Sequence, residues 1–462
     1  MRGWGGLGAV LVAAASVHGA AAPAADLAGV VAVRDRALKD GTAWSIVESL
    51  TTEVGPRPTG SAAMIRARDW ATAKLKALGF QNVRAEPFEA EAWVRGAEHA
   101  EVTAPFPQPL SILGLGRSVP TPKGGLEAQI AVFGSLDDLI AQPPGALKGK
   151  IVVVNQPMAR TQDGSGYGAN RARTQGAAEA SRRGALAYLV RSLSTGESRS
   201  PHTGAMRQAK DAPAIPAAAL SLADADLLAR MAERGAPVRV RLSMDSRTIA
   251  KAPAWNVVGE IPGRERPGEM IVVGGHLDSW DPGTGATDDG AGVAITIAAA
   301  KAAADRPGGL KRTIRVVLWG AEEMDDSGEA YAAAHRDELP RTVVAGESDA
   351  GAGPIWQARL PKGALDHPAM KAFAASLAPL KAAVSSEPAT RGGADVGPMV
   401  EAGAPVVAMG ADMSRYFDVH HSADDTLDKI DPQSLAQSVA IWSAFLYAVA
   451  DSDVDFRSAA PK

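Results

Sequence analysis

The stretch "VVGGHLDSWDPGTGATDDGAG", residues 272–292, decides the fold and raises the first chemical question. It joins an apolar run that is typical of a buried strand to an alanine-rich segment that is typical of a helix. The connecting loop holds one histidine and four aspartates. Carboxylates that converge on one cleft repel one another unless a cation neutralises them. The stretch therefore predicts a strand, a polar loop and a helix, with a metal site as one explanation for the acidic residues.

The alternation of strand and helix continues along the chain. Three more strands are predicted, at 254–261, 313–320 and 341–349. Three helices are predicted near 292–304, 328–335 and 369–378. Nearer the N-terminus, residues 26–52 predict an amphipathic helix, and Ser61 is expected to cap a second helix that ends at Gly79. This order predicts an α/β sandwich with a central mixed sheet flanked by helices.

The segment between these two regions has a different texture. From about residue 103 to residue 244, short strand-like runs such as "AQIAVFG" and "GKIVVVNQP" are mixed with one predicted helix, "RTQGAAEASRRGALAYLVR". We interpret residues 105–244 as a smaller α/β lobe that is inserted into the main domain. The main domain then comprises residues 22–104 and 245–455.

The N-terminus and the composition limit the classes of function. Residues 1–21 combine Arg2 with an apolar stretch and small residues, which predicts a signal peptide and export to the periplasm or the medium. A disordered alanine- and glycine-rich leader is the alternative. The rest of the chain contains no predicted membrane span. The net charge of −4 offers no basic surface, so no nucleic-acid partner is expected.

Three of the predicted strands of the main domain, those that end near residues 275, 320 and 348, are followed by groups that can bind metal. His276 and Asp278 follow the first of these strands, and Asp288 lies further along the same loop. Glu322 and Glu323 follow the second strand, and Asp349 follows the third. A loop near the C-terminus adds four more such residues: His420, His421, Asp424 and Asp425. The carboxyl ends of strands in such sheets gather at the functional edge. The chain has no cysteine, so a metal site must use imidazole and carboxylate ligands. Each signal is weak alone, but together they predict two divalent ions, with zinc as the expected metal.

These motifs resemble the co-catalytic zinc exopeptidases of the M28 family, whose pattern is H-x-D, D-D/N-G/A-x-G, E-E, D and H-x-x-x-D-T. Further stretches are similar to the carboxypeptidase Q branch of that family, among them "TTEVGPRPTGS", "ILGLGRSVPTP", "SPHTG", "VVLWGAEE" and "HHSADDT". The resemblance covers residues 26–451 and implies that the inserted lobe is a protease-associated-type domain. It is also compatible with a homodimer.

The resemblance assigns a role to each residue of the site. His276 and Asp349 would bind one metal, Glu323 and His421 the other, and Asp288 would bridge them. Glu322 is the expected general base, which takes a proton from the attacking water and passes it to the leaving amine. Asp278 would accept the second ring N–H of His276. The family pattern also implies a cis peptide bond between Asp288 and Asp289. Apart from the resemblance, Asp281 and Asp289 are expected to be solvated residues of a surface loop.

The implied activity is hydrolysis of dipeptides or short peptides at a free end. Arg57, Asp395 and Tyr416 are candidates for contact with the substrate, although Tyr416 also suits a packing role. Within the enzyme class, an M28 aminopeptidase that needs only a free N-terminus is the alternative. From another class, a non-catalytic receptor or scaffold would have lost a ligand or Glu322, and all are present.

Overall fold

A computed structural model describes residues 1 and 26–459 of the chain. The predicted signal peptide at residues 1–21 therefore lies almost entirely outside the described residues. Within the described part, no helix is long and apolar enough to cross a membrane.

The chain builds one large mixed sheet and one small sheet. The large sheet has the order β11-β9-β10-β8-β4-β5-β6-β7-β3, with β1 and β2 joined to it through β8, and the small sheet has the order β13-β12-β14. Strands β9, β10 and β11 are parallel, whereas β8 is antiparallel to β10. The strands are β1 (Gln81–Ala104), β2 (Gln108–Leu110), β3 (Ile112–Gly114), β4 (Leu126–Phe133), β5 (Lys150–Val154), β6 (Ala187–Arg191), β7 (Ala217–Leu220), β8 (Arg239–Ile261), β9 (Arg266–His276), β10 (Arg312–Trp319), β11 (Thr342–Glu347), β12 (Ile355–Arg359), β13 (Ala383–Val384) and β14 (Ala408–Ala411).

Helices cover both faces of the part of the sheet that contains β9, β10 and β11. Side chains of β10 alternate between the two faces: Val316 joins the core under α8 and α12, and Val317 joins the core under α9 and α11. The prediction of an α/β sandwich with a mixed sheet is confirmed. The helices are α1 (Leu27–Ala37), α2 (Thr42–Ser49), α3 (Ala62–Ala77), α4 (Leu136–Ile140), α5 (Ser165–Ala169), α6 (Ala172–Arg182), α7 (Leu222–Glu233), α8 (Ala291–Ala304), α9 (Ser327–Ala334), α10 (Pro368–Ser376), α11 (Gly397–Glu401) and α12 (Pro432–Ala450).

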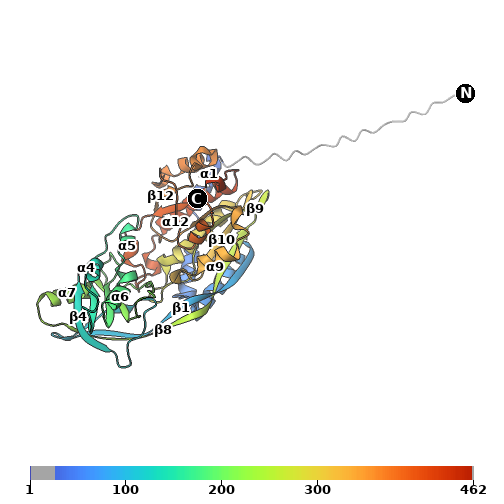
Figure 1. Ribbon diagram of the computed structural model, residues 1–462. Coiled ribbons are helices and arrows are strands. Elements are labelled where there is room, and N and C mark those ends of the chain that lie inside the picture. The colour runs from blue at the N-terminus through green and yellow to red at the C-terminus, as the bar shows by residue number, and fades with distance from the viewer. Residues whose placement is uncertain (2–25, 460–462) are drawn as a thin grey trace.

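The two long strands β1 and β8 connect the two parts of the molecule. They pair antiparallel along almost their whole length, and Figure 1 shows them running from the part that holds β9 and β10 to the part that holds β4. At one end β8 pairs with β10, and at the other end it pairs with β4. Strands β4 to β7 and their helices have hydrophobic cores of their own. Of the two expected boundaries, 104/105 falls at the end of β1 and 244/245 falls within β8.

Two helix predictions need correction. The residues between β1 and β8 form four helices, α4 to α7, where one was expected. The expected helix also ends early, because Gly184 adopts a left-handed φ of 85° and residues 187–191 form the buried central strand β6. Near the N-terminus, the single helix expected at 26–52 is divided into α1 and α2. Ser61 does cap α3 by accepting from Met64 N at 3.1 Å.

Candidate active site

The parallel strands bring the predicted polar groups to one edge of the sheet. His276 is the last residue of β9, Glu322 and Glu323 follow β10, and Asp349 follows β11. His421 comes from the loop that precedes α12. These five side chains, together with Asp288 from the loop after β9, border one cleft or lie directly beneath it. The topology therefore brings together residues that are up to 145 positions apart in the sequence, as the spacing from His276 to His421 shows.

Asp288 lies between two histidines. Its Oδ1 is 3.1 Å from His276 Nε2, and its Oδ2 is 3.1 Å from His421 Nε2. Each histidine also lies near a second carboxylate: Asp349 Oδ1 is 3.8 Å from His276 Nε2, and Glu323 Oε2 is 3.2 Å from His421 Nε2. Asp288, the carboxylate that was expected to bridge the two metal ions, thus lies between two groups of donors. Each group consists of one histidine and one further carboxylate.

His420 also lies close to this centre. Its Nε2 is 3.5 Å from Asp288 Oδ2, and its ring stacks on that of His421 with 3.5 Å between the centroids. The motif spacing favoured His421, which is nearer to Asp288 and also reaches Glu323. Burial, together with the neighbouring His421, holds the pKa of His420 well below its ordinary value. His420 packs against the ring of His421, and it belongs to the same centre, because Asp288, His420 and His421 offer ligand atoms that all lie within 4.8 Å of one another.

The loop that carries Asp288 is held from both sides. Asp425 accepts from Thr287 N at 2.7 Å and from Asp288 N at 3.2 Å, which explains the aspartate of the motif "HHSADDT". The Asp288–Asp289 peptide bond is cis, as the family resemblance predicted. Asp289 was expected to be solvated, and that expectation is wrong. Its side chain is fully buried and accepts from His276 N at 3.0 Å and Gly292 N at 2.9 Å, so it joins the end of β9 to the start of α8.

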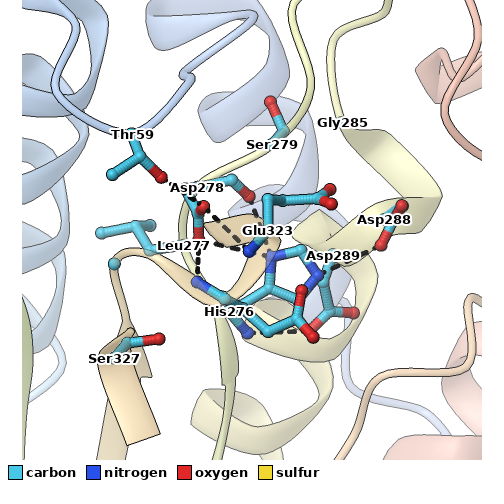
Figure 2. A network of polar contacts seen from close by, with 12 residues as sticks. Thr59, His276, Leu277, Asp278, Ser279, Gly285, Asp288, Asp289, Glu323 and Ser327 are labelled. Atoms are coloured by element: carbon cyan, nitrogen blue, oxygen red, sulfur yellow. Dashed lines mark hydrogen bonds and ion pairs between the residues drawn. The ribbon is translucent and has the colours of Figure 1, made fainter. Parts of the chain in front are cut away.

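Asp278 has a different partner from the one expected. His276 Nδ1 lies 3.0 Å from the backbone carbonyl of Asp278 and 3.6 Å from its carboxylate. The carboxylate instead accepts from Thr59 Oγ1 at 2.8 Å, Glu322 N at 3.1 Å and Glu323 N at 3.3 Å. Figure 2 shows Asp278 between Thr59 and the backbone of Glu323. Asp278 therefore positions the turn that carries both glutamates.

Arg57 lies beneath the loop and not in the cleft. Its side chain is fully buried and donates to the carbonyl oxygens of Leu277, Thr284 and Gly285. Gly285 adopts a left-handed φ of 60°, which a side chain would strain. Arg57 therefore fixes the shape of the loop, and the substrate contact suggested for it does not fit this position.

The other two candidates for substrate contact lie in different places. Asp395 is buried behind the site, where it accepts from Ser327 Oγ at 2.6 Å, and burial raises its pKa to about 7. It does not border the cleft, so it is not placed to contact a substrate. Tyr416 does border the cleft, although its side chain is largely buried against His420.

The cleft, of about 340 Å³, is bordered by both parts of the molecule. Residues 105–244 contribute a set of side chains that the motif analysis did not single out: Arg117, Tyr167, Arg173, Thr174, Ala205, Met206 and Arg207. No local pattern distinguishes these residues from ordinary surface positions. They become candidates only because the fold places their segment over the ends of β9 and β10.

The charges of the site fit a bound divalent cation. Burial raises the pKa of Glu322 well above its ordinary value and that of Asp349 to about 6, and neighbouring carboxylates add to both shifts. Glu323 Oε1 is buried without a hydrogen-bond partner among the described residues. His276, Asp288 and Asp349 offer ligand atoms that all lie within 4.8 Å of one another. Imidazole and carboxylate donors in this arrangement suit zinc and similar ions.

An α/β sandwich with such a donor set at its strand ends defines a metal-dependent hydrolase. The model of the family "Peptidase family M28" matches residues 256–446. Carboxypeptidase Q from Bos taurus is 36% identical over 403 residues, which cover 87% of this chain and 84% of that protein. Carboxypeptidase Q from Xenopus laevis is 35% identical over similar shares. The chain therefore belongs to peptidase family M28, and it is a metallo-exopeptidase.

Solved structures agree with this assignment. A peptidase M28 precursor from Shewanella amazonensis is 42% identical, with a TM-score of 0.91 over 94% of this chain and 99% of that one. A zinc aminopeptidase from Bacillus subtilis shares the fold at 18% identity, with a TM-score of 0.63 over 89% of this chain. The architecture is therefore retained at much lower identity.

Proposed function

We propose that this protein is an exported exopeptidase with two zinc ions that hydrolyses dipeptides or short peptides. His276 and Asp349 would hold one ion, Glu323 and His421 the other, and Asp288 would bridge them. The observation that carries this proposal is the position of Asp288, whose two oxygens each lie 3.1 Å from a different histidine. A carboxylate shared in this way is the usual bridge of a paired metal site.

Glu322 is the proposed general base. When bound, the ions would polarise the scissile carbonyl and make water a better nucleophile. Glu322 borders the same cleft as Asp288 and is not in contact with either histidine ligand, so its carboxylate stays free to exchange protons. Its raised pKa suits a group that takes a proton from water and returns it to the leaving amine. Asp278 supports this role by holding the backbone N–H groups of Glu322 and Glu323.

The substitution Glu322→Gln tests the mechanism. It keeps the size of the side chain and removes the base, so kcat for an unblocked dipeptide should fall by at least ~10²-fold while bound metal is retained. Metal content is measured by elemental analysis, and activity is measured with and without a chelator. Glu329→Gln, on the exposed side of α9, serves as the matched control. A metal-loaded Glu322→Gln protein with full activity would contradict the proposed mechanism.

The organisation of the chain belongs to the same proposal. Residues 105–244 would be an inserted protease-associated-type domain, supported by the separate hydrophobic cores around β4 to β7. Residues 1–21 would direct export, which N-terminal sequencing of protein recovered outside the cytoplasm tests. The family relation also supports a homodimer, which light scattering of the purified protein tests.

A further inference from the structure

Arg173 is an arginine without an acidic partner in an acidic cleft. It is the second residue of α6, its side chain is half-buried, and it borders the same cleft as Asp288 and Glu322. Among the described residues, no carboxylate oxygen lies within 4.0 Å of its nitrogens. Three other arginines between the two parts of the molecule are paired with carboxylates: Arg95 with Asp281, Arg117 with Glu91, and Arg160 with Asp418.

The protein leaves most donors of this guanidinium unused. Arg173 Nη1 lies 3.4 Å from the carbonyl oxygen of Thr203 and 3.3 Å from His421 Nδ1, and Nε is buried without a partner among the described residues. If His421 binds metal through Nε2, its Nδ1 carries the hydrogen, which can donate to the same Thr203 carbonyl at 3.3 Å. The imidazole then accepts nothing from Arg173. A guanidinium has five N–H donors, so several stay available.

The surroundings hold this side chain in place. The guanidinium lies over the ring of Tyr167, 5.1 Å from its centroid, and Tyr167 stacks on Phe417 with 4.7 Å between the rings. On the other side, a side chain at Gly204 would collide with the guanidinium. Contact with an aromatic face fixes the position of an arginine without neutralising its charge. Arg173 is therefore pre-positioned and still able to bind an anion.

With metal bound, Arg173 is a cation that a substrate carboxylate can pair with. Two divalent ions would balance the four carboxylates at the centre of the cleft, from Asp288, Glu322, Glu323 and Asp349, when all four are ionised, whereas Asp325 and Arg117 at its border pair with each other. Arg173 and the exposed Arg207 then add positive charges that no carboxylate among the described residues pairs with, and of the two only Arg173 is held in contact with the ring of His421. Arginine and carboxylate form strong, often bidentate hydrogen bonds, particularly where water is partly excluded.

We propose that Arg173 binds the C-terminal carboxylate of the substrate and so determines that one residue follows the scissile bond. This inference rests on the proposed function, because it takes His421 as a metal ligand. One extended residue spans only about 3.3–3.6 Å. An anchor in contact with the ring of a metal ligand leaves room for about one residue between the carboxylate and the reacting carbonyl. The inserted segment would thereby select carboxypeptidase or dipeptidase activity over cleavage that needs only a free N-terminus.

Arg173→Gln tests the inference with two substrates, the dipeptide alanylalanine and its C-terminal amide. Loss of the charged anchor should raise KM for the free dipeptide by about 10- to 100-fold, the usual range for a hydrogen bond to a charged group. The kcat for the free dipeptide should change little. The kcat/KM for the amide should stay within about twofold of the value that the unsubstituted protein shows for the amide. Arg171→Gln, an exposed arginine beside α6, is the matched control and should change neither substrate. Arg173→Lys should recover part of the loss.

Binding without turnover separates this inference from the proposed function. In a Glu322→Gln background, calorimetry should show that Arg173→Gln weakens binding of alanylalanine and not of its amide, with metal content unchanged. Equal losses for both substrates, or loss of metal, would overturn the inference and leave Arg173 as a support for His421. A selective loss in Arg207→Gln, the exposed arginine of the same cleft, with none in Arg173→Gln would also overturn it. Full activity in metal-loaded Glu322→Gln would contradict the mechanism instead.

Discussion

At the scale of single residues, the four aspartates of residues 272–292 differ in environment although they are close in sequence. Asp288 lies between two histidines, and Asp278 accepts hydrogen bonds from the backbone of the two glutamates. Asp289 joins β9 to α8, and Asp281 pairs with Arg95. Of these four aspartates, only Asp288 is placed to bind metal directly. Asp278 and Asp289 hold the backbone around it, which is how groups behind a metal site usually act, whereas Asp281 binds the side chain of Arg95.

The role of Asp278 leads to a prediction. In Asp278→Asn, an amide NH₂ replaces one acceptor that faces the N–H groups of Glu322 and Glu323, so the turn should lose its support. We expect zinc affinity to fall by about 10- to 100-fold, the usual effect of losing such a partner. Competition with a chromogenic chelator measures the affinity. Asp281→Asn on the same loop should leave it unchanged, and equal effects of the two substitutions would contradict the assignment.

At the scale of elements, the site depends on how closely α8 approaches the ends of β9 and β11. Gly292, near the start of α8, lies against the backbone carbonyl of Ser348, which follows β11, and donates to Asp289. A β-carbon at this position would overlap that carbonyl. The glycine therefore allows the helix to pack where the strands deliver His276 and Asp349.

Gly292→Ala should consequently be destabilising. Because backbone and not a flexible side chain obstructs the new methyl group, we expect a loss of about 1–3 kcal/mol in the free energy of unfolding. Denaturant unfolding of the zinc-loaded protein measures this loss. Gly268→Ala on β9 is the matched control, since a β-carbon there meets no atom within 4 Å. An unchanged stability in Gly292→Ala would show that the strand ends can separate from α8 without cost.

At the scale of the whole molecule, the cleft forms where two parts of the chain meet. Arg160 Nη2 lies 2.8 Å from Asp418 Oδ1, and Ser194 Oγ donates to the carbonyl of Phe417 at 3.0 Å. These contacts connect the segment between β1 and β8 to the loop that carries His420 and His421. Because this loop and the strand ends converge on Asp288, a bound cation would link several segments of the fold.

Removal of metal should therefore lower global stability. Buried carboxylates repel one another when no cation lies between them, and a ligand that binds only the folded state stabilises it. At a free zinc concentration 100 times the Kd, the gain is about 2.7 kcal/mol. Thermal unfolding with and without chelator, followed by addition of zinc, should show a reversible shift. The shift should shrink in Asp288→Asn, and its absence in the unsubstituted protein would contradict a structural contribution from metal.

Much of the fold was predictable because it follows local patterns. Continuous apolar runs gave β9, β10 and β11, and Ser61 and Gly79 marked the ends of α3. Strand β1 was not predicted, because Pro87 and several charged residues interrupt its pattern and its register shifts near Gly96. The run at 187–191 was assigned to a helix because short apolar stretches suit either structure. Its burial between β5 and β7 decides in favour of a strand.

The sequence by itself determined the α/β class and the candidate donors, because those signals lie in short motifs at the ends of strands. Only the tertiary structure revealed that Asp278 supports the glutamates, that Asp289 is buried and that Arg57 shapes the loop. It also brought Arg173 to within 3.3 Å of His421, across 248 positions of sequence. The physical reason is that a side chain's role depends on its partners and its burial. Partners that are distant in sequence meet only when the chain folds.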